Sequence, residues 1–487
     1  MPLHLNLHGH DVPLWWVIGG AAVALAAPPL LFAAAFASRV KTKPNRHRTV
    51  TILVLGDIGR SPRMMYHAES FARSGWDTFV VGYGDTPPIP SLLETPRVHL
   101  LHVANPPKPL LKLPWIFRAP IRVIYQIFSV LWLTVFVVPC NTQVLMVQLL
   151  TWATGCKLII DWHNTGYSIL AMRVGVQSPL TRLAKWLERT YGRGAYAHLF
   201  VTKALRDYLT NAWDLHVVFH DRPPPNFGRT EVISRLNSKD IRKTALTHMV
   251  DGCPELRPDR PAFIVSSTSW TADEDFSLLL QALDKYQAAK ARDPSLPRLL
   301  VIITGKGAGR APFEAEVAKR EKSDQWPDVA VRCLFVSAKD YPVVLGCADL
   351  GISMHQSSSG RDLPMKVVDM FGCDVPVFAR DFACIDELVK DGSNGRIFNT
   401  GDELGDQLID TLSGFPSAPK LDKLSQFFRQ QTGASTPQRR YIPSGVEAEW
   451  CTWDENWDAV MRRGVLDFKG RQGSPFGSPA PTAEKLR

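Results

Sequence analysis

The chain alternates short apolar runs with helical patterns, in two separate series. The first series begins at Thr49–Leu55 and ends at Ala197–Thr202, and the second begins at Ala262–Thr268 and ends at Val375–Phe378. Apolar runs of strand length that alternate with helices are typical of parallel sheets covered by helices. Because 487 residues exceed what one core usually supports, we expect two doubly wound α/β domains.

Changes of composition set the predicted domain boundaries. Asp221–Pro225 reads Asp-Arg-Pro-Pro-Pro and interrupts the first series, which predicts a linker. The residues after 463 are rich in Gly, Pro and Ser, a composition typical of disorder. We therefore expect an N-terminal flank (1–48), a first domain (49–225), a second domain (226–415), a helical region (416–463) and a disordered tail (464–487).

The N-terminal flank contains a segment that could cross a membrane. Leu14–Ala37 has no charged residue and exceeds the roughly 20 residues that a bilayer requires. Basic residues follow it directly (Arg39, Lys41, Lys43, Arg46 and Arg48), so the positive-inside rule places the rest of the chain in the cytosol. The alternative is a cleaved signal peptide, whose positive charge should precede the apolar run. We expect a single-pass membrane protein.

A second apolar segment, Ile124–Val138, is shorter. As a helix it would span roughly 22 Å, less than the hydrocarbon core of a bilayer. It is therefore predicted to be a core helix or a helix that contacts lipid.

Charge and cysteine content limit the remaining classes. The net charge is +9, but apart from the cluster between Arg39 and Arg48 the basic residues are scattered and lack a patch interleaved with aromatic residues, which argues against nucleic-acid binding. The eight cysteines have no paired Cys-x-x-Cys spacing and lie within or beside apolar runs, which predicts buried free thiols in a reducing compartment.

The segment Ser357–Cys373 has the features of a nucleotide-diphosphate site. Pro364 suits the first position of a helix, with Asp362 or Leu363 as its cap, and free backbone N–H groups there could bind an anion. Lys366 and Asp369 share a helix face, so a cation for the diphosphate and a carboxylate for the ribose would lie one turn apart. The alternative is an ordinary capped helix in which these two side chains pair with each other.

Three other strand ends carry polar residues at positions where ligands bind in such folds. Gly56–Arg63 places Gly59, Arg60 and Arg63 at a helix start, either as a diphosphate site or as a plain tight turn. Gly305-Lys306-Gly307 could approach a phosphate or simply end a strand. The acidic run Asp273–Asp275 could hold a divalent ion, but compensation of a helix dipole is the favoured interpretation.

The run Asp161-Trp162-His163-Asn164 follows another predicted strand. A general base needs a titratable group within hydrogen-bond reach of the proton it removes, and His163 or Asp161 could serve. The alternative is that these residues only cap and pack the strand end.

Four of these segments together resemble the chitobiosyldiphosphodolichol β-mannosyltransferases: Leu55–Met64, Asp161–Asn164, Ser266–Trp270 and Ser357–Cys373. The likeness runs from the end of the apolar segment to Gly395. The resemblance implies a GT-B fold, GDP-mannose as donor and chitobiosyl diphosphodolichol as acceptor, at the cytosolic face of the endoplasmic reticulum membrane. It also implies inversion at the anomeric carbon.

The resemblance also implies roles for single residues. The donor would be bound by Gly305, Lys306, Gly307, Ser359, Gly360 and Lys366, with Asp369 at the ribose, whereas Gly59, Arg60 and Arg63 would bind the acceptor diphosphate. His163 would be the base, with Asp161 as its orienter or rival. We expect no tightly bound cofactor, with stimulation by Mg²⁺ left open, and association with other early-pathway mannosyltransferases.

The chain departs from the family pattern at three places. Gln148 continues directly into Leu149–Cys156, which is shorter than the usual crossover of at least ~10 residues. Arg361 stands where GT-B relatives have the first glutamate of a Glu-x7-Glu pattern, and Asp374 stands where relatives tend to have glycine. The alternatives are another membrane-bound GT-B enzyme with a different donor, or an inactive scaffold.

Overall fold

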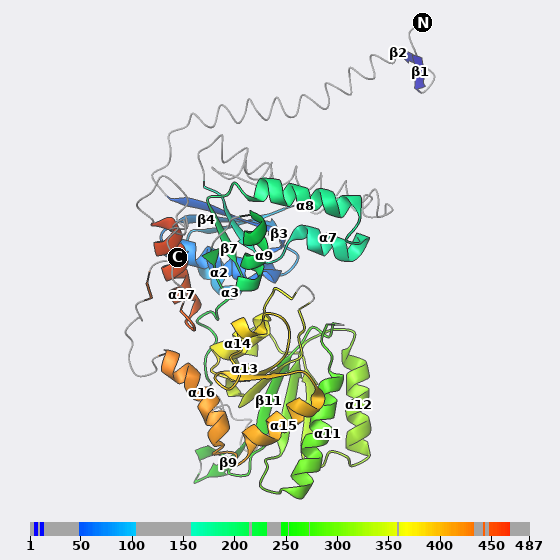
Figure 1. The fold of residues 1–487 in the computed structure, drawn as a ribbon. Helices are drawn as coiled ribbons and strands as arrows, with labels where there is room; N and C mark the ends of the chain where they lie inside the picture. Colours follow the sequence, from blue (N-terminus) through cyan, green and yellow to red (C-terminus); the bar gives the residue numbers. More distant parts are fainter. Residues whose placement is uncertain are drawn as a thin grey trace, which may run out of the picture. The chain divides into compact units, whose positions relative to one another are not determined.

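The computed structural model describes residues 4–7, 10–13, 48–103, 157–213, 217–230, 245–251, 253–271, 273–357, 360–432, 442–443 and 448–467 (Figure 1). The chain divides into two compact units, Met1–Leu158 and Ile159–Arg487. The predicted membrane span Leu14–Ala37, the apolar segment Ile124–Val138 and the short connection Leu149–Cys156 lie outside the described residues. Within the described ranges, every helix is too short or too polar to cross a bilayer.

The first unit contains a parallel sheet of three strands in the order β3-β4-β5. Its elements are β3 (Thr49–Asp57), the short 3₁₀-helix η1 (Ile58–Arg60), α2 (Pro62–Arg73), β4 (Asp77–Tyr83), α3 (Pro90–Glu94) and β5 (Val98–His102). Pro62 is the first residue of α2 after the N-cap Ser61, whose side chain accepts no capping hydrogen bond. A separate antiparallel hairpin joins β1 (His4–Leu7) to β2 (His10–Pro13).

The second unit begins with another three-stranded parallel sheet, in the order β6-β7-β8. It consists of β6 (Ile159–Trp162), α7 (Gly166–Val174), α8 (Pro179–Gly192), β7 (Ala197–Phe200), α9 (Lys203–Trp213) and β8 (Val217–Val218). The first strand of each three-stranded sheet, β3 and β6, lies at an apolar run of the sequence. The structure thus confirms the parallel α/β character of this half.

A six-stranded parallel sheet follows, in the order β13-β12-β11-β14-β15-β16. Its strands are β11 (Ala262–Ser267), β12 (Leu299–Thr304), β13 (Val329–Leu334), β14 (Leu350–Ser353), β15 (Val377–Arg380) and β16 (Gly395–Phe398). The helices are α11 (Ser277–Arg292), α12 (Arg310–Lys322), α13 (Tyr341–Cys347), α14 (Met365–Gly372), the 3₁₀-helix η3 (Ile385–Glu387) and α15 (Gly401–Leu412). The strand order reverses between β11 and β14, and ligands of such sheets bind at the carboxyl ends of the strands at this switch point.

Buried apolar side chains fill both faces of this sheet. Ile264, Val301 and Ile352 belong to one cluster, which packs against α11 and α15, and Val265, Val367 and Phe371 belong to the other, which includes α14. The strands are apolar on both faces because helices cover both, as is usual for parallel sheets. β16 was not predicted, because Gly395–Phe398 is a short run that carries an arginine.

The C-terminal elements extend further than the sequence suggested. They comprise α16 (Pro419–Thr432), α17 (Trp453–Asn456) and the π-helix η4 (Trp457–Leu466), and a capping box of Thr452 and Glu455 starts α17. The predicted tail therefore begins too early, because Gly464 and Val465 are buried in η4. A small antiparallel hairpin, β9 (Thr247–Val250) and β10 (Cys253–Leu256), was also not predicted.

The predicted linker packs against the C-terminal region. Arg222 is buried and donates to the carbonyl of Ala448 at 2.8 Å, and Trp453 N donates to the carbonyl of Pro223 at 3.1 Å. The predicted domain boundary at 225/226 thus lies inside the second compact unit, in a segment that contacts the C-terminal region. The division into domains at this position stays a prediction.

Candidate functional site

Lys366, in the first turn of α14, forms an ion pair at the switch point of the six-stranded sheet. Its Nζ lies 2.8 Å from Glu274 Oε1 and 3.4 Å from Ser269 Oγ. The Glu274 side chain is only 2% exposed, whereas that of Lys366 is 28% exposed. The ammonium is therefore held from the protein side and remains accessible to an anion from solvent. The alternative interpretation, in which Lys366 pairs with Asp369, does not hold, because Glu274 is the ion-pair partner of Lys366.

Glu274 is itself fixed by the loop that follows β11. Its Oε2 accepts from Thr268 Oγ1 at 2.5 Å and from Ser269 N at 2.9 Å, and Glu274 forms an isolated bridge with His355 after β14. These bonds join the loops that follow the two switch-point strands. The sequence interpretation treated Glu274 as one of three acids near a helix start and did not predict its ion pair with Lys366.

Of the acidic run Asp273–Asp275, Asp275 contacts the start of α11, which begins at Ser277, whereas Asp273 and Glu274 bind other groups. Asp275 accepts from Ser277 N at 3.1 Å, and Asp273 lies 3.3 Å from His355 Nδ1. Among the described residues no cluster of His, Cys, Asp and Glu has the arrangement of a metal site. Three adjacent acids thus have three separate roles, which their spacing alone does not reveal.

Gly305 and Gly307 allow the loop after β12 to lie directly against the loop after β11. A Cβ on Gly305 would lie 1.8 Å from the carbonyl oxygen of Thr268, and one on Gly307 would lie 2.1 Å from that of Ser269. Gly305 also has a φ of +141°, which side chains rarely adopt. Lys306 Nζ lies 3.5 Å from the centre of the Phe335 ring. The glycines therefore support the loop that holds Glu274.

Asp369 lies one turn after Lys366 and is partly buried. Its carboxylate accepts from the Tyr341 hydroxyl, and the oxygen of that hydroxyl lies 3.1 Å from Ser267 Oγ. Burial raises the pKa of Asp369 to about 7, the hydrogen bond with Tyr341 and the charge of Lys366 lower it, and the nearby Asp221 raises it. The carboxyl is thus linked to the end of β11.

The start of α14 differs from the prediction by one residue. Pro364 is the N-cap, not the first helical residue, and Asp362 instead hydrogen-bonds the Ser357 hydroxyl. Gly360 has a φ of +66°, which suits a glycine in this turn. Ser359 lies outside the described residues.

Two surface hollows distinguish the two ends of the sheet. A hollow of about 560 Å³ is lined by residues that follow four strands, including Trp270 and Glu274 after β11, Gly309 after β12, Gln356 after β14 and Arg380 of β15. It therefore lies near the carboxyl ends of the strands, with further walls from α11 and α12, and Glu274, the partner of Lys366, contributes to its lining.

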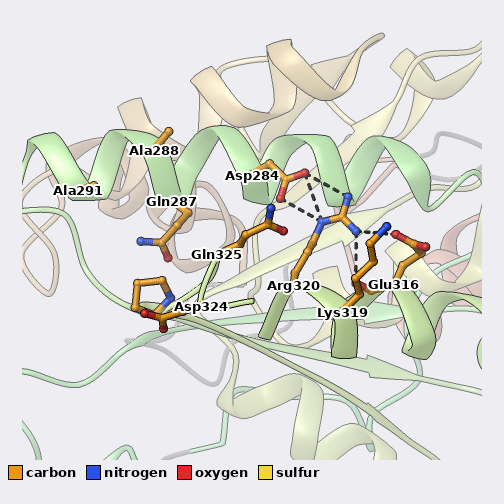
Figure 2. Close-up of a pocket in the computed structure, with 10 residues that line it drawn as sticks. Asp284, Gln287, Ala288, Ala291, Glu316, Lys319, Arg320, Asp324 and Gln325 are labelled. Carbon is orange, nitrogen blue, oxygen red and sulfur yellow. Dashed lines mark hydrogen bonds and ion pairs between the residues drawn. The ribbon is translucent and has the colours of Figure 1, made fainter. Parts of the chain in front are cut away.

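The other hollow, of about 610 Å³, lies between α11 and α12 (Figure 2). Arg320 bridges Asp284 and Glu316 there, with its Nε 3.1 Å from Asp284 Oδ1 and its Nη1 2.9 Å from Glu316 Oε2. The turn before β13 supplies Asp324, Gln325 and Pro327, so this hollow faces the amino-terminal end of that strand. Its lining carries three acids and two bases, Arg320 is already paired with two of the acids, and we assign this hollow no ligand.

His163 and Asp161 lie at the end of β6. His163 Nε2 is 3.2 Å from Asp161 Oδ2, and the His163 side chain is 45% exposed. When Nε2 carries the proton and donates to this carboxylate, Nδ1 is the basic nitrogen. The predicted orientation of the imidazole by Asp161 therefore has the required geometry.

Glu188 of α8 fixes the loop after His163 and was not predicted. Its Oε1 accepts from Tyr167 N at 2.8 Å at the start of α7, and a Cβ on Gly166 would lie 2.5 Å from this oxygen. Burial raises the pKa of Glu188 to about 7, and the backbone N–H groups of Tyr167 and Gly166 lower it. Only a glycine three residues after His163 hinted at such a close contact.

Arg361 and Glu387 connect the six-stranded domain to the β7–α9 segment within the second unit. The Arg361 guanidinium lies 3.8 Å from the centre of the Tyr208 ring, and its carbonyl accepts from Thr202 Oγ1 at 2.6 Å. Glu387 accepts from the backbone of Lys203 at 2.6 Å and lies 2.8 Å from His220 Nε2. Glu387 thus accepts from the backbone N–H groups at the start of α9, and these groups are bound by the protein itself.

Gly59, Arg60 and Arg63 belong to the first unit and are described by themselves. Gly59 N donates to Asp57 Oδ1 at 3.3 Å, and a Cβ on Gly59 would lie 2.4 Å from the carbonyl oxygen of Thr86. The Arg60 side chain is 80% exposed, but Arg63 is 3% exposed within α2. Of the two arginines, Arg60 is the one open to an anion.

Comparison with known proteins extends this picture. A family model described as "Glycosyl transferase 4-like domain" matches residues 59–218. A Mus musculus chitobiosyldiphosphodolichol beta-mannosyltransferase is 37% identical over 85% of this chain and 89% of its own length. The Arabidopsis thaliana protein "UDP-glycosyltransferase TURAN" is 37% identical over 75% of this chain and 89% of its own.

Among solved structures, Anabaena Alr3699/HepE in complex with UDP-glucose is similar, with a TM-score of 0.52 and 15% identity. The match covers 79% of this chain and 95% of that chain. At this identity the likeness shows the fold alone, the parallel-sheet α/β fold of GT-B glycosyltransferases. The extent and identity of the sequence matches show more: this chain belongs to the chitobiosyldiphosphodolichol β-mannosyltransferase family.

Proposed function

We propose that this protein transfers mannose from GDP-mannose to chitobiosyl diphosphodolichol, forming a β-1,4-mannosyl linkage. The names of its relatives support the mannosyl transfer and the lipid-linked acceptor. The observation that carries the proposal is the Lys366–Glu274 pair at the carboxyl ends of β11 and β14. An ammonium at this position can stabilise the negative charge of a departing nucleoside diphosphate.

The transfer requires one displacement at the anomeric carbon, because the donor is α-linked and the product is β-linked. The acceptor hydroxyl oxygen forms a bond to the anomeric carbon while the bond from that carbon to the diphosphate oxygen breaks, and GDP leaves. His163 accepts the hydroxyl proton, and Asp161 orients its imidazole and stabilises the positive charge that forms. Lys366 receives the leaving diphosphate, and Asp369 binds the donor ribose.

The remaining assignments follow from the sequence. Leu14–Ala37 would anchor the chain in the endoplasmic reticulum membrane with its catalytic part in the cytosol. Arg60 would bind the acceptor diphosphate, with Gly59 permitting the tight turn and Arg63 shaping the helix behind it. No tightly bound cofactor is needed, Mg²⁺ would act only by stimulation, and other early-pathway mannosyltransferases would be the partners.

The test uses detergent-solubilised full-length protein with GDP-mannose and a synthetic chitobiosyl diphospholipid. The expected product carries one additional hexose by mass, and both Lys366→Ala and His163→Ala should strongly reduce it. Lack of turnover with intact GDP-mannose binding would contradict the proposal and favour an inactive scaffold.

A second candidate is a glycosyltransferase that uses a UDP-sugar, favoured by the printed name of the Arabidopsis relative. Competition separates the two. GDP should displace the donor and UDP should not, if GDP-mannose is the substrate; preferential displacement by UDP would favour the second candidate.

A further inference from the structure

The outer face of α8 carries a cluster of exposed apolar side chains. Nine large hydrophobic residues are exposed among the described residues, and four of them lie within eleven positions: Val176, Leu180, Leu183 and Trp186. They are between 51% and 72% exposed. The last three are spaced by three residues, so they form one stripe along the helix. Val176 precedes α8 and the other three residues belong to it, and such a concentration of exposed apolar side chains marks an interaction surface.

Basic residues accompany this stripe. Arg182, Lys185, Arg189 and Arg193 are all exposed. With about 100° of rotation per residue, Arg182, Arg189 and Arg193 form a second stripe next to the apolar one. The single acid of α8, Glu188, points inward and accepts from the backbone of α7. The exposed face of α8 is therefore apolar and positively charged, with no acid to offset it.

We propose that this face of α8 docks on a membrane surface that carries anionic headgroups. An apolar stripe with a tryptophan beside a row of arginine and lysine is the composition of helices that lie in a bilayer interface. The apolar side chains would enter the headgroup boundary, and the basic side chains would contact lipid phosphates and carboxylates. A soluble acidic protein would match the charge alone and leave Leu180, Leu183 and Trp186 without an apolar environment.

The position of α8 gives this docking a consequence for catalysis, which rests on the proposed function. α7 and α8 lie side by side, and Glu188 joins α8 to Tyr167 N at 2.8 Å, four residues after His163 (Figure 1). A docked α8 would therefore hold the Asp161–Gly166 loop at a fixed height above the lipid surface. The acceptor is a lipid-linked sugar, so its hydroxyl would be presented at that surface.

The first test locates the docking face in the full-length chain. A Leu183→Cys variant is labelled with an environment-sensitive fluorophore, and Met249→Cys, an exposed apolar site on β9, is the matched control. The parent chain, treated identically, gives the background from native cysteines. Proteins are reconstituted in vesicles of phosphatidylcholine with or without phosphatidylserine, each containing brominated lipid as quencher.

We expect quenching of the label at position 183, stronger with phosphatidylserine, and no quenching at position 249. Arg182→Glu combined with Arg189→Glu should abolish the phosphatidylserine effect. Equal quenching at both sites, or none at position 183, overturns the proposal. A label at position 183 that is already shielded in detergent and unchanged by lipid also overturns it, because protein then covers the face.

The second test measures activity with Leu183→Glu/Trp186→Glu. Turnover of an acceptor embedded in vesicles should fall by about ten-fold or more, because two apolar side chains lose their lipid contacts. Turnover of a water-soluble short-chain acceptor should stay unchanged. Equal losses on both acceptors contradict docking. If the parent chain uses neither acceptor, the proposed function fails, and the quenching experiment still decides whether α8 docks.

Discussion

The donor-side pair and the predicted base differ in how firmly the protein holds them. Lys366 is bound to a glutamate whose side chain is 2% exposed, and that glutamate has two further hydrogen bonds in the loop after β11. His163, in contrast, is 45% exposed and lies beside Asp161 at 3.2 Å. A charge that must meet a diphosphate benefits from being fixed in advance, whereas a base must reach a hydroxyl that arrives with the acceptor.

Removal of the Lys366 ammonium should give the largest effect. We expect Lys366→Ala to lower kcat by roughly 10³-fold, because the leaving diphosphate loses its preorganised cation. Steady-state rates with saturating acceptor measure this. Lys319→Ala is the matched control, since Lys319 lies on α12 at the other hollow and should matter far less. Equal losses in both variants would mean that general positive charge matters and not the fixed pair.

His163→Ala should lower kcat by roughly 10²-fold, the usual contribution of a general base. Added imidazole should restore part of the rate, because a small base can enter an exposed site. Asp161→Asn should retain more activity than His163→Ala and should not respond to imidazole. Imidazole rescue of Asp161→Asn instead would assign the base to the carboxylate.

The parallel α/β domains and the position of Lys366 near a helix start could be predicted from the sequence, because both depend on local patterns. Alternating apolar runs, a proline near a helix start and Lys three residues before Asp can be read within one segment. The partner of Lys366 could not be predicted this way, since Glu274 is 92 residues away and looked like a helix-start acid. Glu188 was missed for the same reason, because its contact with Tyr167 joins two helices.

The stability of the sheet that contains β6 should depend on pH through His198. This buried histidine accepts from Trp162 Nε1 at 3.1 Å, and burial lowers its pKa from 6.5 to about 4. The unfolded chain therefore binds more protons between these values, and stability falls as the pH falls through them. We expect a loss of about 2 kcal/mol between pH 7 and pH 5.

Urea unfolding of the full chain at both pH values measures this loss. His198→Asn, which can still accept from Trp162, should flatten the dependence. His99→Asn, a change at an exposed histidine of β5, should leave it as it is. An unchanged slope in His198→Asn would show that other groups dominate the acid sensitivity.

Glu274→Gln tests whether the buried charge positions Lys366. Glutamine keeps the shape and can accept from Thr268 and Ser269 but cannot pair with the ammonium, so we expect kcat to fall by roughly ten-fold. The affinity for GDP-mannose should change in parallel, measured by equilibrium binding. Asp275→Asn, in the same acidic run, bonds only the local turn and should retain activity. Similar losses in both variants would instead favour a shared role for the acids, such as holding a metal ion.

The smallest expected effect concerns Asp374, at the end of α14. Its φ is +55°, a conformation that suits glycine, and burial raises the pKa of its carboxyl above the usual value while Arg229 and Arg429 lower it. Asp374→Gly should therefore stabilise the folded chain by about 1 kcal/mol near neutral pH, without changing activity. Urea unfolding provides the measurement.

Asp324→Gly is the matched control, because Asp324 has a φ of +56° but is exposed. Both variants relieve the strain of a positive φ at a residue with a side chain, but only Asp374→Gly also removes a partly buried carboxylate. With a folded pKa above 3.8, ionised Asp374 destabilises the fold near neutral pH and no longer does so when protonated at low pH. The gain in Asp374→Gly should therefore shrink on acidification, whereas that in Asp324→Gly should not. Equal, pH-independent gains would show that the backbone alone accounts for the effect, and that the donor-side helix ends without an electrostatic penalty.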